Sequence, residues 1–80
     1  MNVRLLKSKR AAKGLNQTEA SSMIGLGMSR YCLKENGNYP FTLREVQAMS
    51  SVYDLTLDDV NAIFFDGTLP NGSDLQDGRV

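Results

Sequence analysis

The residue types that most catalytic chemistry requires are missing from this sequence. Its 80 residues contain no histidine and a single cysteine, Cys32. Without histidine, neither a Ser-His-Asp nor a Cys-His arrangement can form, and there is no Cys/His cluster for zinc. The adjacent acids Asp58 and Asp59 diverge by ~100° on a helix, so they do not make an acid–base pair. We therefore expect a binding protein rather than an enzyme, with no metal and no cofactor.

The charges that could bind a polyanion are concentrated in one half of the chain. Nine Lys and Arg balance nine Asp and Glu, so the net charge is zero. Residues 1–44, however, contain eight basic and two acidic side chains, which gives this half a net charge of +6. Residues 45–80 contain one basic and seven acidic side chains, which gives that half a net charge of −6. Such a split can orient a protein on a polyanion such as nucleic acid.

Five short helices are expected to position these residues. Helical signals recur along the chain, and no alternating strand pattern lasts long enough to compete. Potential N-terminal caps precede several of these helices, as in Asn16 with Glu19 and Thr42 with Glu45. The predicted helices span residues 2–13, 17–24, 28–35, 43–53 and 57–65.

Helical spacing also predicts which side chains face the core. The predicted inward stripes are Val3, Leu6 and Arg10 in the first helix, Val46, Met49 and Tyr53 in the fourth, and Leu57, Val60 and Phe64 in the fifth. Ile63 and Phe65 flank the last stripe, and spacing leaves open whether they face the core or a dimer surface.

The chain is predicted to form one all-α domain at residues 1–65. Residues 66–80 contain two Asp-Gly pairs, Asn-Gly, a proline and few apolar side chains, so we expect a flexible acidic tail there. The longest apolar run, Ala62 to Phe65, is far shorter than the ~20 residues that cross a bilayer, and the first residues lack the apolar stretch typical of a signal peptide. We expect a cytoplasmic protein with no membrane partner.

The residue sizes from Gln17 to Gly37 fit a helix-turn-helix made by the second and third helices. Closely crossing helices need a small residue at Ser21, and the turn needs a residue that tolerates positive φ at Gly25. Tyr31 is one of the apolar side chains expected to converge behind the motif. Lys34 departs from the pattern because it falls on an inward position, where its stem packs while its ammonium reaches solvent or a phosphate.

These features give the sequence a family resemblance. The resemblance is carried by KSKR, GLNQTEA, the Gly25 turn, KENG and the last helix, which begins after Thr56. Residues 3–65 resemble the lambdoid phage repressor and Cro (XRE-type) family. The chain is also similar to small regulators of Gram-positive phages and mobile elements, which share KENG, Pro-Phe-Thr and a terminal Phe-Phe. The resemblance implies a compact five-helix, lambda-repressor-like DNA-binding domain that presents residues 28–35 to the major groove, usually as a homodimer on operator DNA.

The resemblance also implies roles for individual residues. Gln17 matches a phosphate-binding glutamine, and Arg44 matches a basic position that reaches the backbone or minor groove. Arg10 and Glu35 match a structural ion pair. The other implied DNA-binding positions are Asn36 and Asn38 in the loop, and Met28, Ser29, Cys32 and Leu33 at the bases with Arg30 at the margin.

The base-reading positions carry few hydrogen-bond donors, which keeps two functions open. Met, Cys and Leu side chains touch thymine methyl groups at best, whereas bidentate base recognition calls for Arg, Lys, Asn or Gln. One hypothesis is a repressor-like transcription regulator bound to operator DNA. The alternative is an antirepressor or modulator that binds a cognate repressor through the same apolar face. Both require Met28 and Leu33 to lie at the surface, with Tyr31 in the core.

Overall fold

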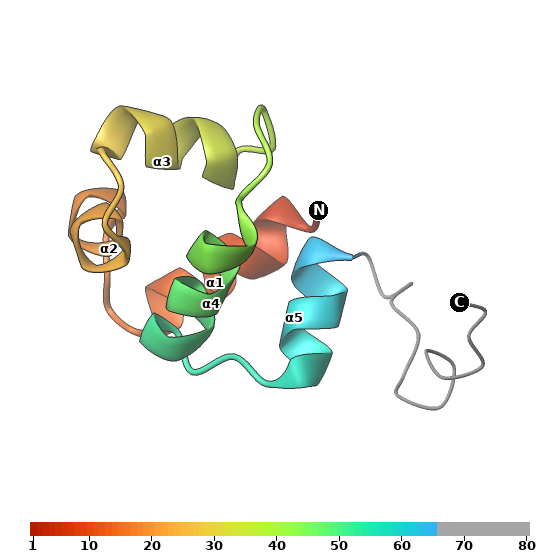
Figure 1. Ribbon diagram of the computed structural model, residues 1–80. Helices are drawn as coiled ribbons and strands as arrows, with labels where there is room; N and C mark the ends of the chain where they lie inside the picture. Colours follow the sequence, from red (N-terminus) through yellow and green to blue (C-terminus); the bar gives the residue numbers. More distant parts are fainter. Residues whose placement is uncertain (66–80) are drawn as a thin grey trace.

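The computed structural model describes residues 1–65, and this part of the chain is all-helical, as predicted (Figure 1). Two of the predicted helices, residues 17–24 and 28–35, have the bounds that the sequence predicts; the first is shorter by one residue at each end, and the last two are shorter by one residue at their C-terminal ends. The expected tail at 66–80 lies outside the described residues. The helices are α1 (Val3–Ala12), α2 (Gln17–Ile24), α3 (Met28–Glu35), α4 (Leu43–Val52) and α5 (Leu57–Phe64).

Local hydrogen bonds explain where most of these helices begin. The side chains of Asn2, Asn16, Thr42 and Thr56 each accept a hydrogen bond from a first-turn amide of the helix that follows. The last three also form complete capping boxes, in which the side chain of the third helical residue accepts a hydrogen bond from the backbone N–H of the cap residue. The starts of α2, α4 and α5 are therefore encoded by short sequence motifs.

Glycine ends α2 and sets the turn that leads to α3. Gly25 has φ +89°, the left-handed conformation that other residues adopt only with strain, and its N–H donates to the Ser21 carbonyl. Ser21 is 3% exposed and Ala20 is fully buried, so small side chains occupy the buried side of α2. Figure 1 shows α2 and α3 joined by this short turn at one end of the molecule.

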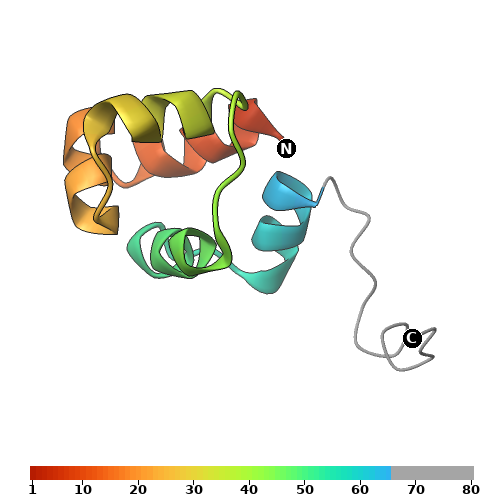
Figure 2. The same ribbon diagram turned by 45° about the horizontal axis from the view of Figure 1, so that its top comes forward.

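The core takes at least one side chain from every helix. Its buried members are Leu6, Ala20, Tyr31, Met49, Tyr53 and Ile63. Phe41 extends the core between Tyr31 and Phe64, with ring centroids 6.0 and 5.9 Å away respectively. Figure 2 shows α1, α2 and α3 on one side of this core, with α4 and α5 on the other.

The predicted inward stripe of α5 is wrong at Leu57, which is 86% exposed, whereas Ile63 is fully buried. Leu57 is the first residue of the helix, and α5 is anchored to α1 at its other end, where the Asn2 N–H donates to the Ile63 carbonyl over 2.6 Å. The start of α5 therefore extends past the core. Within residues 1–65, no helix has the length and apolar character needed to span a membrane.

Candidate nucleic-acid interface

One side of α3 is buried and the other faces solvent. Tyr31 is fully buried, whereas Met28 is 48% and Leu33 is 42% exposed, as the sequence predicts. Ser29 is exposed and Cys32 is half-buried on the same side of the helix. We call Met28, Ser29, Cys32 and Leu33 the outward face of α3. The exposed Arg30 lies at its margin.

A fully buried carboxylate holds α3 to the rest of the domain. Glu35 accepts hydrogen bonds from Arg10 Nε at 2.8 Å, Gln17 Nε2 at 2.8 Å and the Tyr31 hydroxyl at 2.7 Å. The predicted Arg10–Glu35 ion pair is therefore present. Tyr31 also bonds the Tyr53 hydroxyl at 2.6 Å, so this Glu35 network connects α1, α2, α3 and the C-terminal end of α4.

The network determines the charge state of Glu35. Burial alone would raise the pKa of this carboxyl, but hydrogen bonds from Arg10, Gln17 and Tyr31 outweigh burial and lower it. The hydrogen bond to Glu35 in turn raises the pKa of Arg10. Burial, followed by the bonds to Tyr53 and Glu35, raises the pKa of Tyr31, so that its hydroxyl keeps its proton. A buried ion pair at neutral pH results.

Sequence reasoning missed the two tyrosines of this network, although a signal for one of them exists. Tyr31 and Glu35 are four residues apart, a spacing that places two side chains on the same side of a helix. Tyr53 was predicted only as an apolar core residue. No local spacing reveals its bond to Tyr31, because the two residues are 22 positions apart in the sequence.

The side chain of Gln17 is directed into the protein. Its Nε2 donates to Glu35 at 2.8 Å, and its Oε1 accepts from the Cys32 thiol at 3.1 Å. The amide nitrogen carries two N–H donors, and the structure uses one of them for Glu35. The predicted phosphate contact of Gln17 thus stays a prediction, and the structure adds a structural role for the same side chain.

The structure gives Lys34 a partner that the sequence does not indicate. Its ammonium donates to both carboxylate oxygens of Glu45, at 2.7 and 3.0 Å. The two side chains are only 12% and 15% exposed. Burial would raise the pKa of Glu45, but its bonds with Lys34 and Thr42 lower it. This ion pair ties the end of α3 to the first turn of α4.

The cations divide into a paired and an unpaired set. Residues 1–65 contain eight Lys and Arg, of which four form ion pairs. The pairs are Arg10–Glu35, Lys34–Glu45, Lys9–Asp59 and Lys13–Asp54. The unpaired cations, which have no carboxylate partner among the described residues, are Arg4, Lys7, Arg30 and Arg44.

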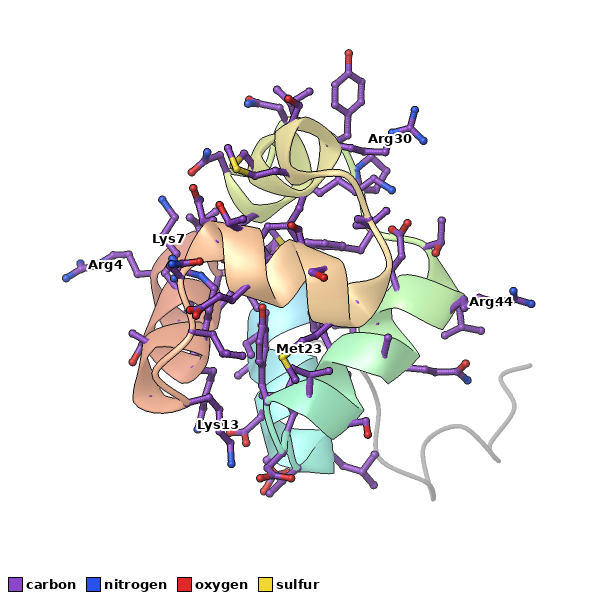
Figure 3. The ribbon with its side chains drawn as sticks, turned by 90° about the vertical axis from the view of Figure 1, so that its left-hand side faces the viewer. Arg4, Lys7, Lys13, Met23, Arg30 and Arg44 are labelled. Carbon is purple, nitrogen blue, oxygen red and sulfur yellow. The ribbon has the colours of Figure 1, made fainter. Side chains whose placement is uncertain are left out.

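The unpaired cations flank α3. In Figure 3, which looks at the molecule from the side of α2, Arg4 and Lys7 project to one side of α3, and Arg30 and Arg44 project to the other. Lys13 points away from α3 in the same view. Sequence reasoning did not assign a role to Arg4, although its spacing of three residues from Lys7 puts both on one side of α1.

The loop after α3 extends this surface. Asn36 and Asn38 are both exposed there, and their backbone N–H groups donate to carbonyls of α3. A groove beside the loop is lined by Ser29, Arg30, Leu33, Lys34, Tyr39 and Pro40. The structure therefore brings the predicted loop residues next to the outward face of α3.

No feature of a catalytic metal centre accompanies this surface. Residues 1–65 contain no group of three or more Cys, Asp or Glu side chains that could hold a metal ion. Comparisons of the chain with protein families, with curated proteins and with solved structures find no match.

Proposed function

We propose that this protein is a small cytoplasmic transcription regulator, without enzymatic activity, that binds operator DNA through a helix-turn-helix formed by α2 and α3. The observation that carries the proposal is the position of the unpaired cations. Arg4 and Lys7 lie on one side of α3, and Arg30 and Arg44 lie on the other (Figure 3). The remaining Lys and Arg side chains of residues 1–65 are paired with carboxylates.

This arrangement matches the geometry of a DNA major groove. The groove is ~12 Å wide and admits one α-helix, whose diameter with side chains is ~10–12 Å. A helix lying in the groove has a row of phosphates on either side. Cations on both sides of α3 would therefore face phosphates on both strands, while the outward face of α3 meets the base edges.

Salt dependence of binding tests the proposal. The assay is fluorescence anisotropy with the intergenic DNA that flanks the protein's own gene, repeated over a range of salt concentrations. Each neutralised phosphate contributes about −0.9 to the slope of log affinity against log salt, so the four unpaired cations predict a slope of roughly −3 to −4 per chain. Binding that does not respond to salt, or no binding to this DNA, contradicts the proposal.

The family resemblance suggests that the DNA-bound form is a homodimer. A helix-turn-helix dimer reads two half-sites one helical turn apart, so the protected site should be pseudo-palindromic. Footprinting of the bound DNA and analytical ultracentrifugation of the complex measure these two properties.

A second function is favoured by the exposed apolar side chains near α3. Met28 is 48%, Leu33 is 42% and Tyr39 is 59% exposed, an adaptable surface of the kind that binds proteins. An antirepressor would use it to bind a cognate repressor. In that case Leu33→Asp abolishes copurification with the regulator encoded beside this gene, and the purified protein alone shows no salt-dependent DNA binding.

A further inference from the structure

The polar side chains that normally read bases are scarce on the outward face of α3, and some of those nearby are already bonded within the protein. Both ends of the Gln17 amide are occupied, by Glu35 and Cys32. The Lys34 ammonium is held by Glu45. Within α3, the hydroxyl of Ser29 and the guanidinium of Arg30 are the polar groups left for an external partner.

The apolar side chains on this face are exposed and, in one case, held in position. The Thr18 hydroxyl donates to the sulfur of Met28 at 3.0 Å, which ties this side chain to α2 while it stays 48% exposed. Leu33 lies five residues further along α3, about 140° around the helix axis from Met28, and is 42% exposed. The helix therefore offers two apolar contact points about one and a half turns apart.

The floor of the major groove contains one apolar group that matches these contact points. It is the C5-methyl group of thymine, since the other groove edges present hydrogen-bond donors and acceptors. Arg30 lies at the margin of this face, and in Figure 3 Arg44 projects from α4 on the same side of α3 as Arg30; these unpaired cations supply the charge complementarity that favours a phosphate-bearing partner.

We propose that α3 selects its DNA site through thymine methyl groups, with Met28 and Leu33 as the specificity-determining residues. This inference rests on the proposed DNA-binding function and deepens it, because it names the chemical group that the protein distinguishes. Burying a methyl-sized apolar group changes affinity roughly fourfold, so two contacted thymines account for about a tenfold to twentyfold preference.

Replacement of thymine by deoxyuridine tests the inference, because this change removes the methyl group and keeps the hydrogen-bonding edge. A random-sequence duplex library is first selected with the full-length protein. The enriched duplex is then synthesised with thymine and with deoxyuridine at every thymine position. We expect the deoxyuridine duplex to bind roughly tenfold more weakly, with an unchanged salt slope, since the phosphate contacts are the same.

Variants assign the effect to the two residues. Met28→Ala and Leu33→Ala should each reduce the difference between the two duplexes by roughly fourfold, because each removes the partner of one methyl group. Leu57→Ala is the matched control: it removes an apolar side chain that is 86% exposed at the start of α5, and it should leave the full difference. Circular dichroism verifies that each variant is folded.

The outcomes separate this inference from the function on which it rests. Equal affinity for both duplexes, or a library that yields no enriched sequence although DNA is bound, overturns thymine reading and leaves DNA binding intact. A deoxyuridine penalty that persists in both α3 variants assigns the methyl effect to DNA shape and also overturns the inference. Absence of binding to any duplex overturns the proposed function itself.

Discussion

Replacing Glu35 by Gln should strongly destabilise the domain. The substitution keeps the size of the side chain and removes its charge, and it converts one accepting oxygen into a donor. Arg10, whose side chain is 14% exposed, then loses its buried partner and keeps a bond from Nη1 to the Leu15 carbonyl. Removing one partner of a buried ion pair costs ~3–5 kcal/mol. Because Arg10 keeps some contact with solvent and its bond to Leu15, we expect a loss of ~3 kcal/mol, at the lower end of this range.

Urea denaturation followed by circular dichroism measures this loss. In thermal unfolding, ~3 kcal/mol corresponds to a decrease in Tm of roughly 12 °C or more for a domain of this size. The control is Lys9→Gln, which removes the Lys9–Asp59 pair, whose side chains are 33% and 22% exposed. Solvent screens a pair of this kind, so Lys9→Gln should cost much less than Glu35→Gln.

A double variant distinguishes the ion pair from the packing around it. When Arg10→Met accompanies Glu35→Leu, no charge remains desolvated, so the double variant should be more stable than Glu35→Leu alone. The reasoning is refuted if Glu35→Gln costs no more than Lys9→Gln, or if the two charge-removing changes are simply additive.

The same network predicts the response to acid. The native-state pKa of Glu35 is lowered, chiefly by its bond from Arg10 against the opposing effect of burial. A carboxyl with a lowered pKa stabilises the fold at pH values above its unfolded pKa of about 4.3, and this contribution is lost as pH falls through the lower folded value. Wild-type stability should therefore decline below about pH 5, and the Glu35→Gln variant should show a flatter profile over this range.

Three further predictions concern the turn, the phosphate contacts and the start of α4. Gly25→Ala should cost ~1–2 kcal/mol in urea denaturation because φ is +89°, whereas Gly27→Ala, at φ −66°, should cost less than ~1 kcal/mol. Arg44→Ala should weaken DNA binding and reduce the salt slope by about 0.9, whereas Lys13→Ala, which removes a cation already paired and directed away from α3, should leave the slope unchanged in the anisotropy assay. Glu45→Ala removes both a capping box and an ion pair, so a loss of ~2–3 kcal/mol in urea denaturation is expected, and a loss below ~0.5 kcal/mol contradicts this assignment.

The helix bounds were predictable because the chain carries short-range signals for them. Asn16 with Glu19 begins α2 and Gly25 ends it, and each signal acts within a few residues of its helix end. The outward position of Met28 and Leu33 was expected from the family resemblance, and both side chains are exposed in the structure.

The partners of polar side chains were less predictable because they depend on contacts between helices. The sequence shows Lys34 on an inward position but not Glu45, eleven residues away, as its partner. Gln17 is 18 residues from Glu35, so its inward bond is likewise invisible to local patterns. The inward stripe of α5 was wrong at Leu57, and spacing left the position of Ile63 open, because the contact with α1 that accompanies the burial of Ile63 lies far away in the sequence.

The bonds of the Glu35 carboxylate to several helices should restrict independent opening of α3. Because Glu35 bonds side chains from α1 and α2 as well as its own helix, α3 cannot detach without breaking buried bonds to both neighbours. Slow amide exchange in α3 should then require opening of the whole domain, so its protection would match that of α1 rather than that of an independently fraying segment. A surface built on α3 would consequently be presented to its partner already ordered, with little entropy left to lose on association.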